Sequence, residues 1–228
     1  MIQVFAGYDL RESVGYHAFC QSVIDTCTMP VSIAPLSLNQ LRDYYTAGQR
    51  DGTNEFIYSR FLIPFLMGYR EWALFVDGAD MIVKGDLAEL WAMRDGNKAV
   101  QVVKHDYKTK NPRKYVGTAM ECRNDDYPKK NQSSVMLINC GHPAWRKVSP
   151  SFVAEQPGSV LHRFAFMDDV LVGDLPIEWN WLADELGVNP DAKLLHWTAG
   201  SPAFPFYSNA CHADHFRKAH ARANHAIS

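Results

Sequence analysis

Two aspartates, Asp77 and Asp80, interrupt an apolar run in the stretch ALFVDGADMIV, residues 73–83. Two carboxylates in one tight turn supply the hard oxygen ligands that Mg²⁺ and Mn²⁺ prefer, often together with substrate phosphates. In open α/β sheets, ligands bind beyond the carboxyl ends of strands, which is where Asp77 lies if residues 73–76 form a strand. Asp-Gly is also a strong hairpin signal, so a plain turn is the alternative. The solidly apolar flanks favour the metal site, since a hairpin predicts alternating polarity.

Short apolar runs alternate with stretches of helical spacing along the chain. The runs that predict strands are residues 2–7, 31–36, 73–76, 99–104, 133–139 and 193–197. The stretches that predict helices are residues 12–26, 55–67, 86–93, 150–156, 164–173 and 212–224, with a kink or break at Pro64 and an N-cap at Asp86. Because the strands are apolar without alternation, we expect an α/β fold with a mostly parallel central sheet flanked by helices. The lysine-rich connection between residues 104 and 133 predicts a loop region that carries a hairpin.

The composition excludes several classes of protein. Apolar residues make up 47% of the 228 residues, which is enough for a sizeable core. The formal net charge of −2 leaves no broad basic face, so nucleic acid is not an expected partner. No run of about 18 apolar residues predicts a membrane span, and the N-terminus has no signal-peptide pattern. The five cysteines are odd in number and widely spread, which indicates reduced thiols in a cytoplasmic protein.

Five segments of the chain occur in the same order as the motifs of a known family. They are IQVFAGYDLRESVGYHAF (2–19), YSRFLIPFLMGYREWALFVDGADMIVKGDLAELW (58–91), KNQSSVMLINC (130–140), FMDDVLVGDLPIEWNWL (166–182) and LLHWTAGSPAF (194–204). Together they resemble glycosyltransferase family 8, with its GT-A fold and Asp-x-Asp motif, and in particular its bacterial nucleotide-sugar transferases. The likeness extends over nearly the whole chain.

The resemblance implies a retaining enzyme that moves a hexose, glucose or galactose, from a UDP-sugar to a hydroxyl acceptor such as a saccharide. It also implies a divalent metal and assigns Asp77, Asp80 and His196 as its ligands. One nitrogen with two carboxylates favours Mn²⁺ over Ca²⁺, with Mg²⁺ as the alternative ion. Without the resemblance, a half-buried histidine with no ligand is the simpler interpretation of His196. Gly78 and Ala79, in the bend, are assigned with Asp77 to the nucleotide.

Two departures from the family pattern change the expected contacts. Asp77 and Asp80 are separated by two residues instead of one, so Asp80 is the surer metal ligand. Asp77 then contacts the ribose, or reaches the metal through one oxygen or a water. The segment GSPAF also lacks the lysine that family members often place on the diphosphate. We expect backbone N–H groups near Gly200 and Ser201, or Arg60, to contact the phosphates, with an exposed helix position as the alternative for Arg60.

The end of the first strand is where the family holds the nucleoside. Ala6, Gly7 and Tyr8 lie at this end. A glycine lets a ligand approach the backbone, and Tyr8 could stack on the base. A tight turn with a surface tyrosine is the alternative. Arg11 is a second candidate cation for the phosphates.

Three further residues are candidates for the catalytic site. In the family, the region of Asp168 and Asp169 faces the transferred sugar, so we expect one of them to bind sugar hydroxyls or stabilise the oxocarbenium charge. Capping a helix is the more usual role for a carboxylate at the start of a helical segment. Gln132 precedes a strand and is expected to face the donor sugar.

The sequence predicts one GT-A-like domain over residues 1–228, with a nucleotide half at about 1–105 and a sugar and acceptor half at about 106–228. Two other functions stay open. A non-catalytic sugar- or nucleotide-binding module would explain the changed aspartate spacing and the missing lysine. A sugar nucleotidyltransferase is less favoured, because AGYDLRES contains one glycine and no glycine-rich basic loop for a triphosphate.

Overall fold

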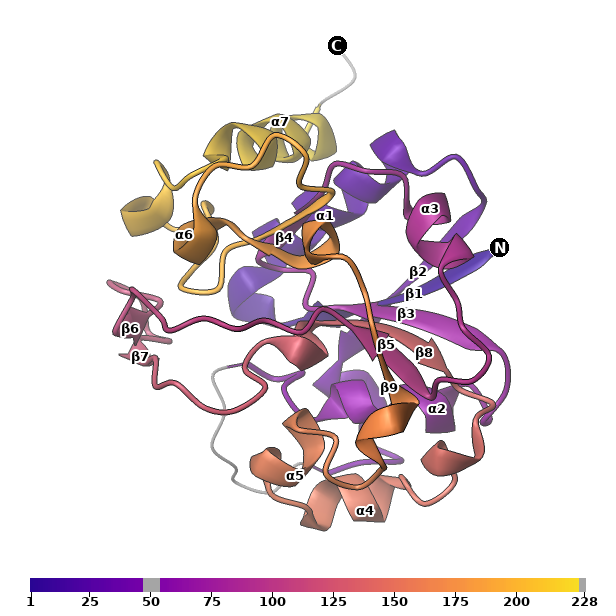
Figure 1. Cartoon of the computed structure of the whole chain (residues 1–228). Coiled ribbons are helices and arrows are strands. Elements are labelled where there is room, and N and C mark those ends of the chain that lie inside the picture. The colour runs from indigo at the N-terminus through magenta and orange to yellow at the C-terminus, as the bar shows by residue number, and fades with distance from the viewer. Residues whose placement is uncertain (47–53, 226–228) are drawn as a thin grey trace.

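The computed structural model describes residues 1–46 and 54–225, and a six-stranded sheet lies at its centre (Figure 1). The strands of this sheet are β1 (Ile2–Tyr8), β2 (Val31–Ser37), β3 (Trp72–Val76), β5 (Val100–Val102), β8 (Val135–Asn139) and β9 (Val172–Asp174). They lie in the order β2-β1-β3-β8-β5-β9. Strand β8 runs antiparallel to β3 and β5, and the other neighbouring pairs are parallel. The predicted α/β fold with a mostly parallel sheet is confirmed.

Both faces of this sheet are buried, which explains why its strands are apolar without alternation. The helices are α1 (Ser13–Thr26), α2 (Ile63–Leu66), α3 (Leu87–Ala92), α4 (Pro150–Glu155), α5 (Gly158–His162), α6 (Ala183–Leu186) and α7 (Ala213–Ala223). Successive side chains of a strand point to opposite faces. Helices α4 and α5 lie on one side of the sheet, and α1 and α3 lie on the other (Figure 1). Phe5 and Phe75 belong to the core cluster shared with α4 and α5, and Val4 and Leu74 belong to the cluster shared with α1 and α3.

A second, three-stranded sheet shows that residues 73–83 do not form a hairpin. It consists of β4 (Met81–Val83), β10 (Trp181–Leu182) and β11 (Leu194–His196), in the order β10-β11-β4. Strand β4 pairs antiparallel with β11, whereas β3 belongs to the central sheet. The hairpin alternative is therefore wrong, since the chain leaves one sheet at Asp77 and enters another at Met81.

Two predicted helices differ from the structure. The segment predicted as a helix over residues 55–67 forms a 3-10 helix at Ser59–Leu62 followed by α2. Pro64 lies in the first turn of α2, where its missing N–H costs no hydrogen bond. The prediction of a helix over residues 164–173 is wrong, because Val172 extends and pairs with Val100 of β5. Pairing in the sheet outweighs the local helical spacing there.

The remaining predicted elements agree with the structure. Asp86 caps α3 by accepting a hydrogen bond from the backbone N–H of Ala88. The lysine-rich connection carries the predicted hairpin, β6 (Arg113–Lys114) paired with β7 (Cys122–Arg123). All five cysteines lie in the described residues and are free thiols. The cytoplasmic location that they indicated stays a prediction.

Within residues 1–46 and 54–225, none of the helices has the length and apolar character needed to cross a bilayer. The division into halves at about residue 105 also stays a prediction.

Candidate metal and nucleotide site

The bend at residues 77–80 is held by close backbone packing. Gly78 has a φ of +77°, in the left-handed region that glycine adopts without strain. The N–H of Ala79 donates to the carbonyl of Asp77, and the N–H of Met81 donates to that of Gly78. A Cβ on Gly15 would lie 1.7 Å from the carbonyl oxygen of Ala79, so the first turn of α1 packs directly on the bend. The bend is therefore fixed by the N-terminal strand and helix, and not by a hairpin ladder.

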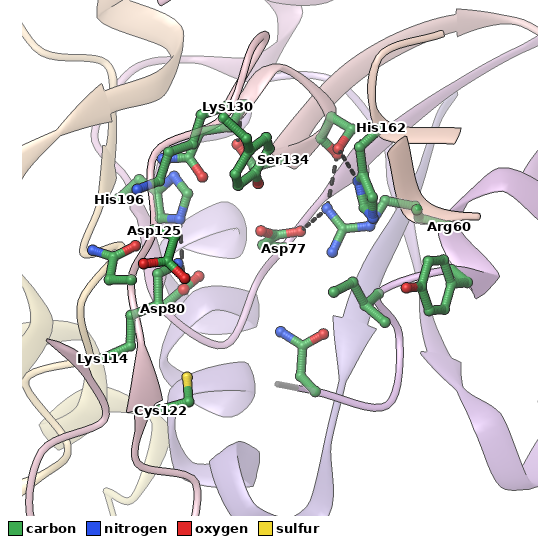
Figure 2. Close-up of a pocket in the computed structure, with 18 of the residues that line it drawn as sticks. Arg60, Asp77, Asp80, Lys114, Cys122, Asp125, Lys130, Ser134, His162 and His196 are labelled. Atoms are coloured by element: carbon green, nitrogen blue, oxygen red, sulfur yellow. Dashed lines mark hydrogen bonds and ion pairs between the residues drawn. The ribbon is translucent and has the colours of Figure 1, made fainter. Parts of the chain in front are cut away.

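The β4–β11 pairing brings the third predicted ligand to the two aspartates. His196 lies opposite Met81 in this ladder, and the N–H of Trp197 donates to the carbonyl of Asp80 over 3.0 Å. His196 Nε2 lies 3.5 Å from Asp80 Oδ2. One ligand atom each from Asp77, Asp80 and His196 can be chosen so that all lie within 4.8 Å of one another. Figure 2 shows the three side chains converging, as the sequence predicts.

Asn180 orients His196, and the sequence did not single it out. Its side-chain NH₂ donates to Ser134 Oγ and to the carbonyl of Asn131. Its Oδ1 is therefore left to accept from His196 Nδ1, at 2.9 Å. This contact holds the ring so that Nε2 faces Asp80, the orientation that a metal-binding histidine requires. The sequence signal for Asn180 is its place between the two tryptophans of EWNWL, which indicates burial. In the structure Asn180 is 0% exposed.

The three side chains fit a hard divalent cation. Asp80 is 7% exposed, and its Oδ1 is a buried oxygen without a hydrogen-bond partner among the described residues. A buried carboxylate oxygen without a partner is costly, and a cation would satisfy it. Glu12 is also buried. Burial, and next to it the negative charge of nearby Asp80, raises the pKa of Glu12 well above its usual range. Two carboxylates and one imidazole suit Mn²⁺ or Mg²⁺.

Arg60 is buried beneath Asp77, at 4% exposure, so its interpretation as an exposed helix arginine is wrong. Its Nη1 lies 2.5 Å from Asp77 Oδ1 and donates to the carbonyl of Ser133 over 2.9 Å. Its guanidinium carbon lies 4.8 Å from the centre of the Phe75 ring, within cation–π range. Burial raises the pKa of Asp77 to about 6, against the opposing effect of Arg60. Arg60 therefore fixes one oxygen of Asp77.

These groups form part of the wall of a cavity of about 740 Å³ (Figure 2). Arg60 and His162 lie to one side of Asp77 in Figure 2, and Asp80, His196, Lys114 and Lys130 lie to the other. Ser133 Oγ is 2.8 Å from His162 Nδ1. Burial, followed by Arg60, lowers the pKa of His162 to about 3, so this side chain is neutral. The cavity is lined by residues from both halves of the sequence, because Asp77 and His196 both face it.

The predicted nucleoside residues lie near the bend but do not line this cavity. A Cβ on Gly7 would lie 2.4 Å from the Phe56 ring, so the space beside Gly7 is filled by protein. Tyr8 packs edge-on against Tyr16, with ring centres 5.2 Å apart. Ala6 is buried beneath the bend.

The bend residues Gly78 and Ala79 are likewise outside the cavity wall. Three other predicted contacts are also engaged elsewhere. The N–H of Gly200 donates to Trp197, Ser201 is buried, and Arg11 forms an ion pair with Asp9 at 2.5 Å. The nucleotide contacts of all these residues stay predictions.

The three predicted catalytic residues do not line the cavity that the metal ligands face. Gln132 is 6% exposed, and its Oε1 has no hydrogen-bond partner among the described residues. It adjoins Ser133 of the cavity wall without lining the cavity itself. Asp168 and Asp169 are exposed, and Asp169 pairs with Lys129 at 2.6 Å. Neither aspartate lines the cavity, and their catalytic roles stay predictions.

Comparisons with known proteins show that this fold is shared with GT-A glycosyltransferases. The model of the family described as glycosyl transferase family 8 matches residues 17–143, which include both aspartates. Protein CDI of Arabidopsis thaliana is 36% identical over 221 residues, which cover 93% of this chain and 83% of that protein. The chain belongs to glycosyl transferase family 8.

Solved glycosyltransferases share the fold at low identity. The bifunctional glycosyltransferase WbbM matches with a TM-score of 0.66 and 16% identity, over 96% of this chain and 49% of that one. GlyE of Streptococcus pneumoniae TIGR4 matches with a TM-score of 0.63 and 12% identity, over 96% of this chain and 60% of that one. The galactosyltransferase LgtC, solved with donor and acceptor sugar analogues, matches with a TM-score of 0.54 and 12% identity. The match covers 100% of this chain and 98% of that one. This chain therefore spans about half to three fifths of the WbbM and GlyE chains, and the shared fold is GT-A.

Proposed function

We propose that this protein is a metal-dependent glycosyltransferase that moves a hexose, glucose or galactose, from a UDP-sugar to a hydroxyl acceptor with retention of configuration. Membership of family 8 supports glycosyl transfer. The observation that carries the proposal is the meeting of Asp77, Asp80 and His196 within 4.8 Å on the wall of a large cavity. The relation to LgtC, a galactosyltransferase solved with donor and acceptor sugar analogues, supports galactose and a saccharide acceptor among the choices.

Each residue of the site has a distinct task in this proposal. Asp80 and His196 would hold the metal, and Asp77 would reach it with the oxygen that does not face Arg60. When bound, a divalent ion here would balance the charge of the donor diphosphate. Asn180 would hold the His196 ring through Nδ1, with Nε2 toward Asp80. Gln132 adjoins the cavity wall, and its buried Oε1, without a partner among residues 1–46 and 54–225, would accept from a sugar hydroxyl.

A UDP-release assay over a panel of sugar nucleotides, with added Mn²⁺ or with chelator, tests this function. We expect release from UDP-glucose or UDP-galactose, stimulated by a hydroxyl acceptor and abolished by the chelator. Anomeric analysis of the product by NMR tests retention. Release that persists unchanged after metal removal would contradict the metal role. Binding of nucleotide without release from any donor would instead support a non-catalytic binding module.

A further inference from the structure

The cations that the sequence offers for the diphosphate already have carboxylate partners. Arg60 is paired with Asp77 at 2.5 Å, and Arg11 is paired with Asp9 at the same distance. Each guanidinium is thus largely neutralised before any ligand arrives. A donor diphosphate beside the metal ligands needs further positive charge, which must come from other residues of the cavity wall.

Lys130 is a buried cation on that wall with a weak partner. Its side chain is 5% exposed, and its Nζ lies 3.4 Å from Asp126 Oδ1, on a side chain that is itself 44% exposed. The ammonium also lies 5.8 Å and 5.9 Å from the ring centres of Tyr107 and Tyr127. Cation–π contacts hold an ammonium in place but do not neutralise it. Burying a charge without a close counter-ion is costly. A bound anion would remove this cost for Lys130.

Lys114 brings a second ammonium to the same part of the cavity. It lies in β6, lines the cavity, and makes no ion pair with any residue in 1–46 or 54–225. Burial, followed by the charge of Lys114, lowers the pKa of Lys130, so the two ammonium groups act on each other. Figure 2 shows both on the side of Asp80 and His196, across Asp77 from Arg60. Two ammonium groups that line the cavity on the side of the metal ligands favour the binding of an anion there.

We propose that Lys130, assisted by Lys114, binds the diphosphate of the nucleotide-sugar donor. The lysine-rich connection then supplies phosphate recognition, in addition to closing one side of the cavity. This inference rests on the proposed function for the identity of the donor, but it requires only that the ligand carries a diphosphate. Lys130 would contact the phosphate oxygens directly, which makes it a binding residue and a stabiliser of the leaving group.

Binding measurements on the full chain with Mn²⁺ test this proposal. Calorimetry would give the affinities for UDP and inorganic pyrophosphate, and ligand-observed NMR would give the affinity for uridine. We expect Lys130→Met to weaken UDP and pyrophosphate binding at least tenfold, as for a lost charge-assisted hydrogen bond, and to leave uridine binding unchanged. Lys130→Arg should recover most of the affinity. Lys108→Met is the matched control, because Lys108 is exposed, lies in the same connection and is outside the cavity wall.

Different outcomes overturn the two proposals separately. UDP binding by the Lys130→Met variant that equals the wild type, or a parallel loss for uridine, would overturn the role of Lys130 alone. A wild-type chain that binds pyrophosphate through Lys130 but does not bind UDP would overturn the proposed donor and support the phosphate site. A wild-type chain that binds neither would overturn both. Because Met removes a buried charge, the melting temperature should stay equal or rise, and a fall would count against a ligand-directed lysine.

Discussion

Two of the pairs of nearby aspartates in this chain, Asp77 with Asp80 and Asp168 with Asp169, lie in contrasting environments. Asp77 and Asp80 lie in a bend between two sheets, where α1 packs on the backbone and β11 delivers a histidine. Asp168 and Asp169 begin a short 3-10 helix on the surface, and both are exposed. Asp169 is already paired with Lys129. Identical side chains therefore have very different surroundings.

The difference shows what makes a carboxylate available for a metal. In the first pair Asp80 is buried and Asp77 is mostly buried, so a carboxylate oxygen left without a partner there is costly and a cation is favoured. The second pair is solvated, so water satisfies its oxygens and a cation gains little. The position after a buried strand, together with a neighbouring strand that supplies a third ligand, separates the two cases more clearly than residue type does.

The largest effect that would sharpen this contrast is expected from Asp80→Asn. The substitution keeps the size of the side chain but removes the charge of Asp80, whose buried Oδ1 has no hydrogen-bond partner in the part of the chain that the structure describes. We expect metal-dependent transfer to fall by more than about 100-fold, because even residues that only orient a ligand cost about 10–100-fold. The UDP-release assay measures it. Unchanged activity in a folded variant would contradict the assignment of Asp80.

A smaller effect is expected from Asn180→Ala, which leaves all three ligands in place. The variant frees His196 Nδ1 from its 2.9 Å contact, so the ring can rotate or change tautomer. We expect the Mn²⁺ concentration for half-maximal activity to rise about 10–100-fold. Activity should recover at saturating Mn²⁺, which separates a positioning role from general misfolding. A lower rate that added metal does not restore would count against this role.

The pH dependence of stability tests how deeply the cavity wall is buried on the side of His162. The pKa of His162 is about 3 in the folded chain, against 6.5 for an ordinary histidine. Below pH 6.5 the unfolded chain binds a proton that the folded chain does not, so stability falls as the pH falls. Between pH 7.5 and 5, we expect the wild type to lose about 2 kcal/mol more than His162→Gln.

Denaturant titrations at several pH values measure this difference. His17→Gln, at an exposed histidine, is the matched control and should follow the wild type. A wild-type profile that matches His162→Gln would mean that this part of the wall is open to water.

The smallest effect is expected from Asp169→Asn. This residue is 81% exposed, and its ion pair with Lys129 lies at the surface, where solvent weakens such pairs. We expect no measurable change in the melting temperature and an unchanged rate of UDP release. A large loss of activity with normal stability would remove the contrast between the two pairs, and would support the catalytic role that the sequence predicts for Asp168 and Asp169.

Much of the fold follows from the sequence because its signals are local. Unbroken apolar strands predict a sheet covered on both sides, and Asp86 marks the start of α3. The helix predicted over residues 164–173 fails because pairing of Val172 with β5 is a long-range contact that local spacing does not contain. The Asp-Gly signal failed for the same reason, since β4 finds its partner in β11 and not in β3.

The candidate site could be predicted where a residue follows a strand, and not where it depends on side-chain partners. Asp77 follows β3, which predicted its place at the site, whereas the family resemblance supplied the set of Asp77, Asp80 and His196 as ligands. Nothing local in the sequence shows that Arg60 is buried against Asp77, that Asn180 orients His196, or that Lys130 lies inside the cavity. These contacts depend on how distant loops pack, which only the folded chain specifies.

Direct measurement of Mn²⁺ binding is the sharpest test that Asp77, Asp80 and His196 form a metal site. Electron paramagnetic resonance of the full chain, titrated with Mn²⁺ in the presence and absence of UDP, distinguishes bound from free ion. We expect one ion bound by the wild type, more tightly with UDP, the same behaviour in Asp169→Asn, and loss of this ion in Asp80→Asn. Binding by Asp80→Asn as tight as by the wild type would contradict the site.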